Sequence, residues 1–148
     1  MKEIIIQLIT AFLGSLGFAM FFNVNKKHII HGSVGGLLGW AVYIVCIRYN
    51  MSIFSASVIT ALLCSAYSEI SARLLKAPAI IFYIPSIVPL IPGSALYYTV
   101  SNAVAGNTDA FQYYGLNTVK YVFGIVVGIT IVSTVIYMIN KIKQEKTI

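Results

Sequence analysis

The charged residues of this chain stand far apart, and the apolar stretches between them limit what it can fold into. Uncharged runs lie between Glu3 and Lys26, Lys27 and Arg48, Arg48 and Glu69, Lys76 and Asp109, and Lys120 and Lys141. Apart from the longer run that follows Lys76, each is close to the ~20 residues that an α-helix needs to cross about 30 Å of hydrocarbon. The pattern predicts an all-α, polytopic membrane helix bundle of about five transmembrane segments.

Composition argues against a soluble domain. The chain has 148 residues, of which 59% are hydrophobic and 9% are charged, whereas an ordinary globular domain carries roughly 25% charged residues. So short a chain has too much surface for its volume to hide this apolar area from water. The first run exceeds the usual signal-peptide core and has no small-x-small cleavage site, so we expect a retained helix. We expect a single transmembrane domain over residues 1–148, with spans at about 4–24, 29–48, 52–72, 79–105 and 118–140.

The basic residues predict the orientation. With five crossings, one side carries three of them, Lys2, Arg48 and Lys120, and the other carries seven, Lys26, Lys27, Arg73, Lys76, Lys141, Lys143 and Lys146. Basic residues favour the cytoplasm, so we expect the N-terminus outside and the C-terminus inside. A fourth segment that re-entered without crossing would give five against five, so the bias favours a crossing. Residues 106–118, the longest polar connection, are expected to form an outer loop, and the net charge of +6 requires no nucleic-acid partner.

Glycines recur at intervals of three or four residues in three of the segments. They are Gly14 and Gly17, then Gly32, Gly35, Gly36 and Gly39, then Gly124 and Gly128. Small residues four apart let another helix approach closely, which drives helix association in lipid. A tightly packed conduit and ordinary bundle packing both fit, and the motifs alone favour ordinary packing. Cys46 and Cys64 lie inside apolar runs and are interpreted as small buried hydrophobes.

All four prolines of the chain fall within residues 78–92. A proline inside a helix has no N–H and crowds the carbonyl four residues earlier. The carbonyls expected to be freed on one helix face are those of Ile81, Pro85 and Val88. Free backbone groups that face lipid cost several kcal/mol each, so such a break persists only where protein or water covers it. We therefore favour a functional break, with a structural kink as the alternative.

The residues after this break favour an anion site. Gly93 permits a backbone turn, and Ser94 is expected to cap a new helix whose exposed N–H groups carry partial positive charge. Such a helix start suits a carboxylate-bearing solute at membrane depth. The candidate substrate-binding residues are Pro85, Pro89, Pro92, Gly93, Ser94, Tyr97 and Asn102.

Glu69 ends the third segment, one helical turn before Arg73. The pair is read first as a surface ion pair worth about 0.3–0.5 kcal/mol. Intramembrane carboxylates also carry protons or substrates, so Glu69 is kept as a coupling candidate. Other polar side chains that could either bond across helices or line a path are Gln7, Asn23 and Asn102.

No set of residues in the chain suits catalysis or metal binding. His28 and His31 lie one turn apart with no third ligand nearby, so an interfacial pair is favoured over a metal site. A nucleophile with a matching base is absent from the sequence, and four acids with two histidines offer little material for one. We expect no enzyme activity, no catalytic residues, no cofactor and no metal.

Three stretches carry a resemblance to a known family. They are residues 17–24 (Gly-Phe-Ala-Met-Phe-Phe-Asn-Val), the helix end at 69–73, and residues 85–97, which contain Pro-Leu-Ile-Pro-Gly at 89–93. The chain resembles the threonine/serine exporter family over nearly its whole length, and more narrowly the small membrane subunit of its split, two-component members. Members commonly have proline after the Asn-Val pair, where this chain has Asn25.

The resemblance implies export of small polar metabolites, which are threonine and serine in some members and C4-dicarboxylates such as succinate in others. It also implies a larger membrane partner, which carries the other transmembrane half and an amphipathic soluble region, in the bacterial cytoplasmic membrane. We favour a subunit of a secondary transporter for threonine and serine, with a homo-oligomer as a further arrangement. The alternatives are a non-transporting scaffold or regulatory subunit that stabilises the partner and, as a weaker one, a passive channel.

Overall fold

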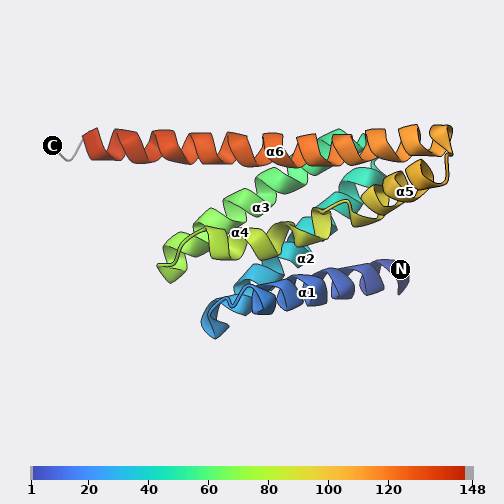
Figure 1. The fold of residues 1–148 in the computed structure, drawn as a ribbon. Coiled ribbons are helices and arrows are strands. Elements are labelled where there is room, and N and C mark those ends of the chain that lie inside the picture. Colours follow the sequence, from blue (N-terminus) through green and yellow to red (C-terminus); the bar gives the residue numbers. More distant parts are fainter. Residues whose placement is uncertain (1, 146–148) are drawn as a thin grey trace.

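The structure is a computed structural model that describes residues 2–145, except for the side chain of Gln144, and these residues are arranged as helices joined by short connections (Figure 1). The elements are α1 (Lys2–Phe21), α2 (Lys26–Arg48), α3 (Ile53–Leu75), α4 (Ile80–Ile87), the 3-10 helix η1 (Val88–Leu90), α5 (Gly93–Val104) and α6 (Thr108–Glu145). Helices α1, α2, α3 and α6 are long and apolar enough to cross a membrane, and α4 to α5 make a fifth span if they are taken as one. The predicted all-α bundle with a broken fourth segment is confirmed.

The broken segment runs the length of the bundle. In Figure 1, α4 begins at the end where α3 finishes, and α5 finishes at the opposite end, where α6 begins. The two parts are bent by 53° at the break. Helices α1 and α6 begin at the same end of the bundle, and α6 returns along its whole length (Figure 1). The segment therefore has the course of one bent span that joins the two ends.

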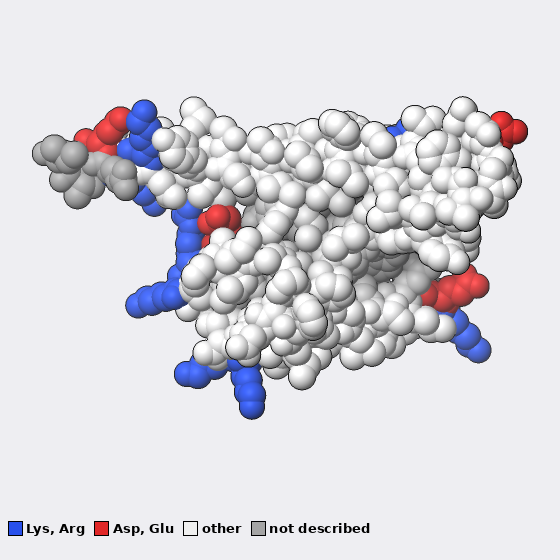
Figure 2. Space-filling view, in the orientation of Figure 1, with Lys and Arg blue, Asp and Glu red and all other residues white. Residues whose placement is uncertain are grey.

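Charged side chains gather mainly toward the two ends of the bundle and leave an apolar middle (Figure 2). Most of the blue Lys and Arg atoms in this view lie at the end where α2 begins and where α3 and α6 finish. This is the end that the sequence assigns to the cytoplasm; Lys146, counted with it, lies outside the described residues. The arrangement keeps ionised groups out of the region that would face hydrocarbon.

Small residues form the helix contacts of the core. The four glycines of α2 are buried against α1, α3 and α4, and a Cβ atom on Gly35 or Gly36 would collide with Ser86 or Ser15 respectively. On α6, a Cβ on Gly128 would stand 2.7 Å from the Val58 carbonyl oxygen. Close backbone approach of this kind is how helices associate in lipid, where burying large apolar side chains gives no advantage. The predicted packing role of these glycines is confirmed.

Helix α1 packs through a different face from the one marked by its glycines. Gly14 and Gly17 are exposed, and an added Cβ would meet nothing within 4 Å among the described residues. The buried positions of α1 are Ala11, Ser15 and Ala19, which repeat every four residues. Gly14 and Gly17 therefore make no close helix contact among the described residues.

The turn between α1 and α2 is built from two asparagines. Asn23 adopts a left-handed conformation with φ of 53°, and Asn25 caps α2 by accepting a hydrogen bond from the Lys27 amide at 3.1 Å. Asn and Asp tolerate the left-handed region better than most residues, and Asn is a strong helix cap. Asn25 thus provides a helix start at the position where the resembling family commonly has proline.

The expected outer loop over residues 106–118 was wrong, because α6 begins at Thr108. Gly106 turns the chain with φ of 72°, and the Asn107 side chain accepts a hydrogen bond from the Ala110 amide at 3.3 Å. That bond caps the helix, so the polar residues that follow become its first turns. With 38 residues α6 is about 57 Å long, and its C-terminal end projects beyond the other helices (Figure 1).

Candidate functional site

The proline-broken segment is held against the glycine face of α2. Pro85 lies inside α4, and a Cβ on Gly32 would stand 3.2 Å from the Cβ and Cγ atoms of its ring. Pro85 cannot donate to the Ile81 carbonyl, whose oxygen lies 3.6 Å from the same position. The Pro85 carbonyl oxygen stands 3.1 Å from where a Cβ of Gly36 would be. Protein therefore covers the disrupted backbone, as a non-helical break at membrane depth requires.

Not every carbonyl that the prolines were expected to free is free. The Val88 carbonyl accepts a hydrogen bond from the Ile91 amide at 3.1 Å, because η1 tightens there into a 3-10 turn. The Ser86 carbonyl lies 3.5 Å from the Cys64 thiol, which donates to it from α3. The expectation for Val88 was wrong, and the backbone of the break is better satisfied than the sequence suggested.

Helix α5 begins two residues earlier than a Ser94 cap would require. Pro92 is the N-cap and has no side-chain capping bond, Gly93 is the first helical residue, and Ser94 lies exposed in the first turn. The Leu96 amide donates to the Pro92 carbonyl at 2.9 Å and closes that turn. The prediction that Ser94 caps α5 was therefore wrong. Its amide still belongs to the helix start, where the N–H groups lack intrahelical acceptors.

The remaining candidates on α5 are an exposed tyrosine and a half-buried asparagine. Tyr97 is 66% exposed, and the Asn102 side-chain amide donates to the Tyr98 carbonyl at 2.7 Å, within its own helix. Helix α5 buries none of its residues and packs mainly on α6. The face that carries Tyr97 is thus open to whatever surrounds this chain.

Pro89 borders a separate cavity of about 230 Å³ on the other side of the break. Its other lining residues are Gln7, Thr10, Ala11 and Trp40. The structure thus distributes the predicted substrate residues along α4, η1 and α5. Pro85 is buried, Pro89 borders this cavity, and Ser94 and Tyr97 are exposed.

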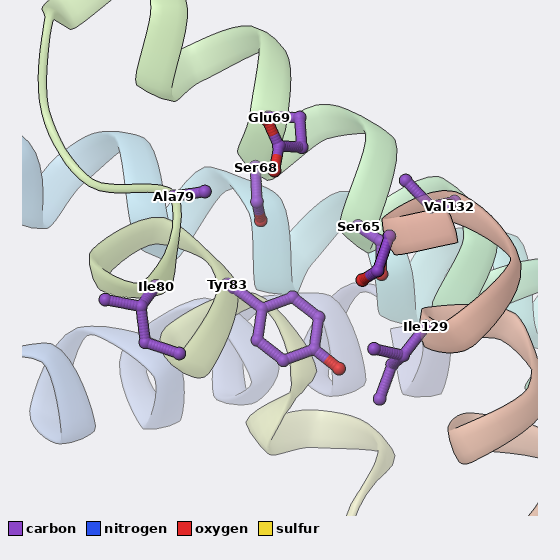
Figure 3. A pocket seen from close by; sticks show the side chains of 9 residues that line it. Ser65, Ser68, Glu69, Ala79, Ile80, Tyr83, Ile129 and Val132 are labelled. Carbon is purple, nitrogen blue, oxygen red and sulfur yellow. The ribbon is translucent and has the colours of Figure 1, made fainter. Parts of the chain in front are cut away.

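Glu69 lies in a cavity of about 230 Å³ between α3, α4 and α6 (Figure 3). The lining residues are Ser65, Ser68, Glu69, Ala79, Ile80, Tyr83, Ile129, Val132 and Ser133. Ser65 and Glu69 are four residues apart on α3, so both side chains reach the same side of that helix. Glu69 is six residues from the end of α3 at Leu75, which places it about 9 Å inside the helix.

Two hydroxyl groups in this cavity have no partner. The Ser65 Oγ and the Tyr83 hydroxyl oxygen are buried, and neither has a hydrogen-bond partner among the described residues. They lie near each other but without hydrogen-bonding geometry. The neighbouring Ser68 hydroxyl, in contrast, donates to the Cys64 carbonyl at 2.7 Å. Buried polar groups are normally bonded, so Ser65 and Tyr83 provide room for one or more polar atoms that bridge them.

The Glu69 carboxylate is not paired with a cation among the described residues. Within residues 2–145 it forms no ion pair, with Arg73 or with any other cation. The surface ion pair favoured by the sequence is therefore not formed. Glu69 and Arg73 do border a second cavity, of about 360 Å³, between α3 and α6. An unpaired carboxylate within a membrane span is costly, which makes it a candidate for binding a cation or a proton.

Sequence reasoning did not identify Ser65 or Tyr83 as site residues. A signal existed for Ser65, which precedes Glu69 by one helical turn and so shares its face. Tyr83 belongs to the proline-rich stretch, but its approach to Ser65 depends on how α4 folds back against α3.

A bundle of helices long and apolar enough to cross a membrane, with a bent and proline-broken fourth segment, is the architecture of a multi-pass membrane protein. Residues 7–135 match the family described as Threonine/Serine exporter, ThrE. The match covers most of the 148 residues, so the chain belongs to this family, and the resemblance seen in the sequence is confirmed. No solved structure matches the chain.

Proposed function

We propose that this chain is the small membrane subunit of a secondary exporter for threonine and serine, which works with a larger subunit of the same family. The observation that carries the proposal is the family match over residues 7–135 in a chain whose described part is a single helix bundle. A C4-dicarboxylate such as succinate is the alternative solute. Because the family's members move polar solutes across a membrane, the broken span is the natural place for the path.

The exposed face of α5 supports the existence of a partner. Large apolar or aromatic side chains on α5 that are exposed in this chain are Leu96, Tyr97, Tyr98, Val100 and Val104. The helix start at Gly93 and Ser94 is exposed beside them. Lipid can cover the apolar side chains but cannot satisfy free N–H groups, so the helix start requires protein or water. A larger subunit that packs on α5 would supply that cover and complete the path.

The proposed orientation in the bacterial cytoplasmic membrane has the N-terminus outside and the C-terminus in the cytoplasm. The gathering of basic side chains at one end of the bundle supports it (Figure 2). In this orientation Glu69 and Tyr83 lie in the cytoplasmic half, since α3 ends and α4 begins at the basic end. The solute would enter the Glu69 cavity first and reach the break at Pro92 and Gly93 afterwards.

The test is efflux from bacteria that lack their own exporters and are preloaded with labelled threonine, serine or succinate. The chain is expressed alone, together with a candidate larger subunit, and that subunit is also expressed without it. Export by the pair only supports the two-subunit exporter, and the solute that leaves fastest identifies the substrate class. Equal export by the larger subunit alone, at matched expression, would make this chain a scaffold and overturn the proposal.

A further inference from the structure

We propose that the cavity between α3, α4 and α6 binds the protonated amine of the exported solute on the Glu69 carboxylate. The cavity would thereby select amine-bearing solutes and reject dicarboxylates. This inference rests on the proposed export function and adds to it the residue that decides the solute class.

The charge of the cavity favours a cationic group on the solute. Nine described residues line the cavity, and Glu69 is the one acidic residue among them. No Lys or Arg is among them. Its carboxylate has no ion pair within residues 2–145. A solute ammonium supplies the missing opposite charge through a charge-assisted hydrogen bond. A dicarboxylate would bring two negative charges beside Glu69 and be repelled.

The two unpartnered hydroxyls can bind a second polar group of the same solute. Ser65 lies one helical turn from Glu69, which is a rise of about 6 Å along α3, and the Tyr83 hydroxyl lies beside it. A hydroxyl both donates and accepts hydrogen bonds, so this pair can bind either the hydroxyl or the carboxylate of the same solute. A solute whose amine bonds Glu69 can direct its hydroxyl or carboxylate toward Ser65 and Tyr83, because a hydrogen bond of about 2.8–3.0 Å at each end adds to the solute's own length.

The volume and lining of the cavity suit a small organic cation better than a bare metal ion. A cavity of about 230 Å³ has room for several waters, each of which takes about 30 Å³ in the liquid. A bare metal ion needs six to eight oxygens at about 2.3–2.6 Å in the case of calcium, and one carboxylate with scattered hydroxyls does not provide that shell. Ile80, Ile129 and Val132 form apolar walls that suit the methyl or methylene groups of a small organic cation.

The neighbouring Arg73 fits this assignment. It borders the second cavity with Glu69 but is not among the residues that line the first one. A site built for a dicarboxylate would place such a cation among its lining residues, because Arg binds carboxylates with two parallel hydrogen bonds. The cavity lined by the hydroxyls contains the Glu69 carboxylate and no Lys or Arg side chain.

The experiment compares threonine with 3-hydroxybutyrate, which is the same molecule without its amine, and with succinate. The wild-type pair of subunits is reconstituted in liposomes beside pairs that carry Glu69→Gln or, as the matched control, Glu3→Gln at the exposed start of α1. We expect wild type to prefer threonine to both amine-free solutes. Glu69→Gln should lower threonine transport on the order of 10- to 100-fold, which is the loss of one charge-assisted bond, and should remove the preference. Glu3→Gln should change neither.

The outcomes separate this inference from the export function. If Glu69→Gln keeps the threonine preference, or if wild type moves succinate rather than threonine, the amine site is wrong while the exporter stands. If the wild-type pair moves none of the three solutes, the proposed function fails and the inference fails with it. Should Glu69→Gln not insert, thermal unfolding of the wild-type pair decides. Protection by threonine and not by 3-hydroxybutyrate supports the site, and equal protection by both overturns it.

Discussion

The ring of Pro85 rests directly on Gly32, where an added Cβ would stand only 3.2 Å from two ring carbons. This contact joins the two most distinctive features of the sequence, the prolines of the broken span and the glycines of α2. Because Gly32 and Gly36 have no side chains, the α2 backbone comes close enough to cover the Ile81 carbonyl at Gly32 and the Pro85 carbonyl at Gly36. The glycines thus make the break tolerable in a membrane, since disrupted backbone there must be covered by protein or water.

Filling this contact face should destabilise the bundle. In Gly36→Val, the new side chain meets Ser15 and the Pro85 carbonyl, so overpacking should cost about 1–3 kcal/mol and lower Tm by roughly 3–9 °C. Gly14→Val is the matched control, because nothing among the described residues lies within 4 Å of its added Cβ. Thermal unfolding of the purified chain in detergent measures both, and equal Tm values would contradict the glycine contacts.

Removing the unpartnered hydroxyls should separate stability from transport. Ser65→Ala and Tyr83→Phe each delete a buried oxygen that has no hydrogen-bond partner among the described residues, so Tm should stay level or rise. Threonine transport by the pair should fall about tenfold, since each hydroxyl is assigned a bond to the solute. Ser68→Ala is the control within the same cavity, because its hydroxyl already donates to the Cys64 carbonyl. Full transport in the first two variants would remove both hydroxyls from the site.

The hydrogen bond between Tyr43 and Tyr121 should stabilise the contact of α2 with α6. The two hydroxyl oxygens are 2.5 Å apart, and Tyr43 is buried. Tyr121→Phe leaves the Tyr43 hydroxyl without this partner and should lower stability by about 1–3 kcal/mol. Adding Tyr43→Phe should recover part of that loss, because neither hydroxyl then stays unpaired. Denaturant unfolding of the two single variants and the double variant measures the coupling, and strictly additive losses would show that the bond contributes nothing.

The sequence predicted the helical class and the broken span because both follow from local rules. Long uncharged runs require helices in lipid, and the concentration of prolines before Gly93 interrupts the fourth of them. The packing of the α2 glycines was predictable for the same reason. The helical start of α6 was missed, because the Asn107 cap outweighs the polar composition of the residues that follow.

The Glu69 cavity could be predicted only in part. Glu69 stood out as a carboxylate in an apolar segment, but its lack of an ion pair depends on where the Arg73 side chain lies in three dimensions. The meeting of Ser65 with Tyr83 depends on the packing of α4 against α3, which no local pattern encodes. The open side of Gly14 and Gly17 was equally unpredictable, since glycine spacing marks a helix face but not the partner that it meets.

The most direct test of the central claim, that this chain forms part of the solute path, is threonine efflux by the pair when Pro92 and Gly93 are both replaced by alanine. A continuous helix there should straighten the 53° bend and abolish efflux, with both subunits present in the membrane at wild-type levels. Unchanged efflux at those levels would contradict the claim, because a chain whose broken span can be straightened without effect does not form the path.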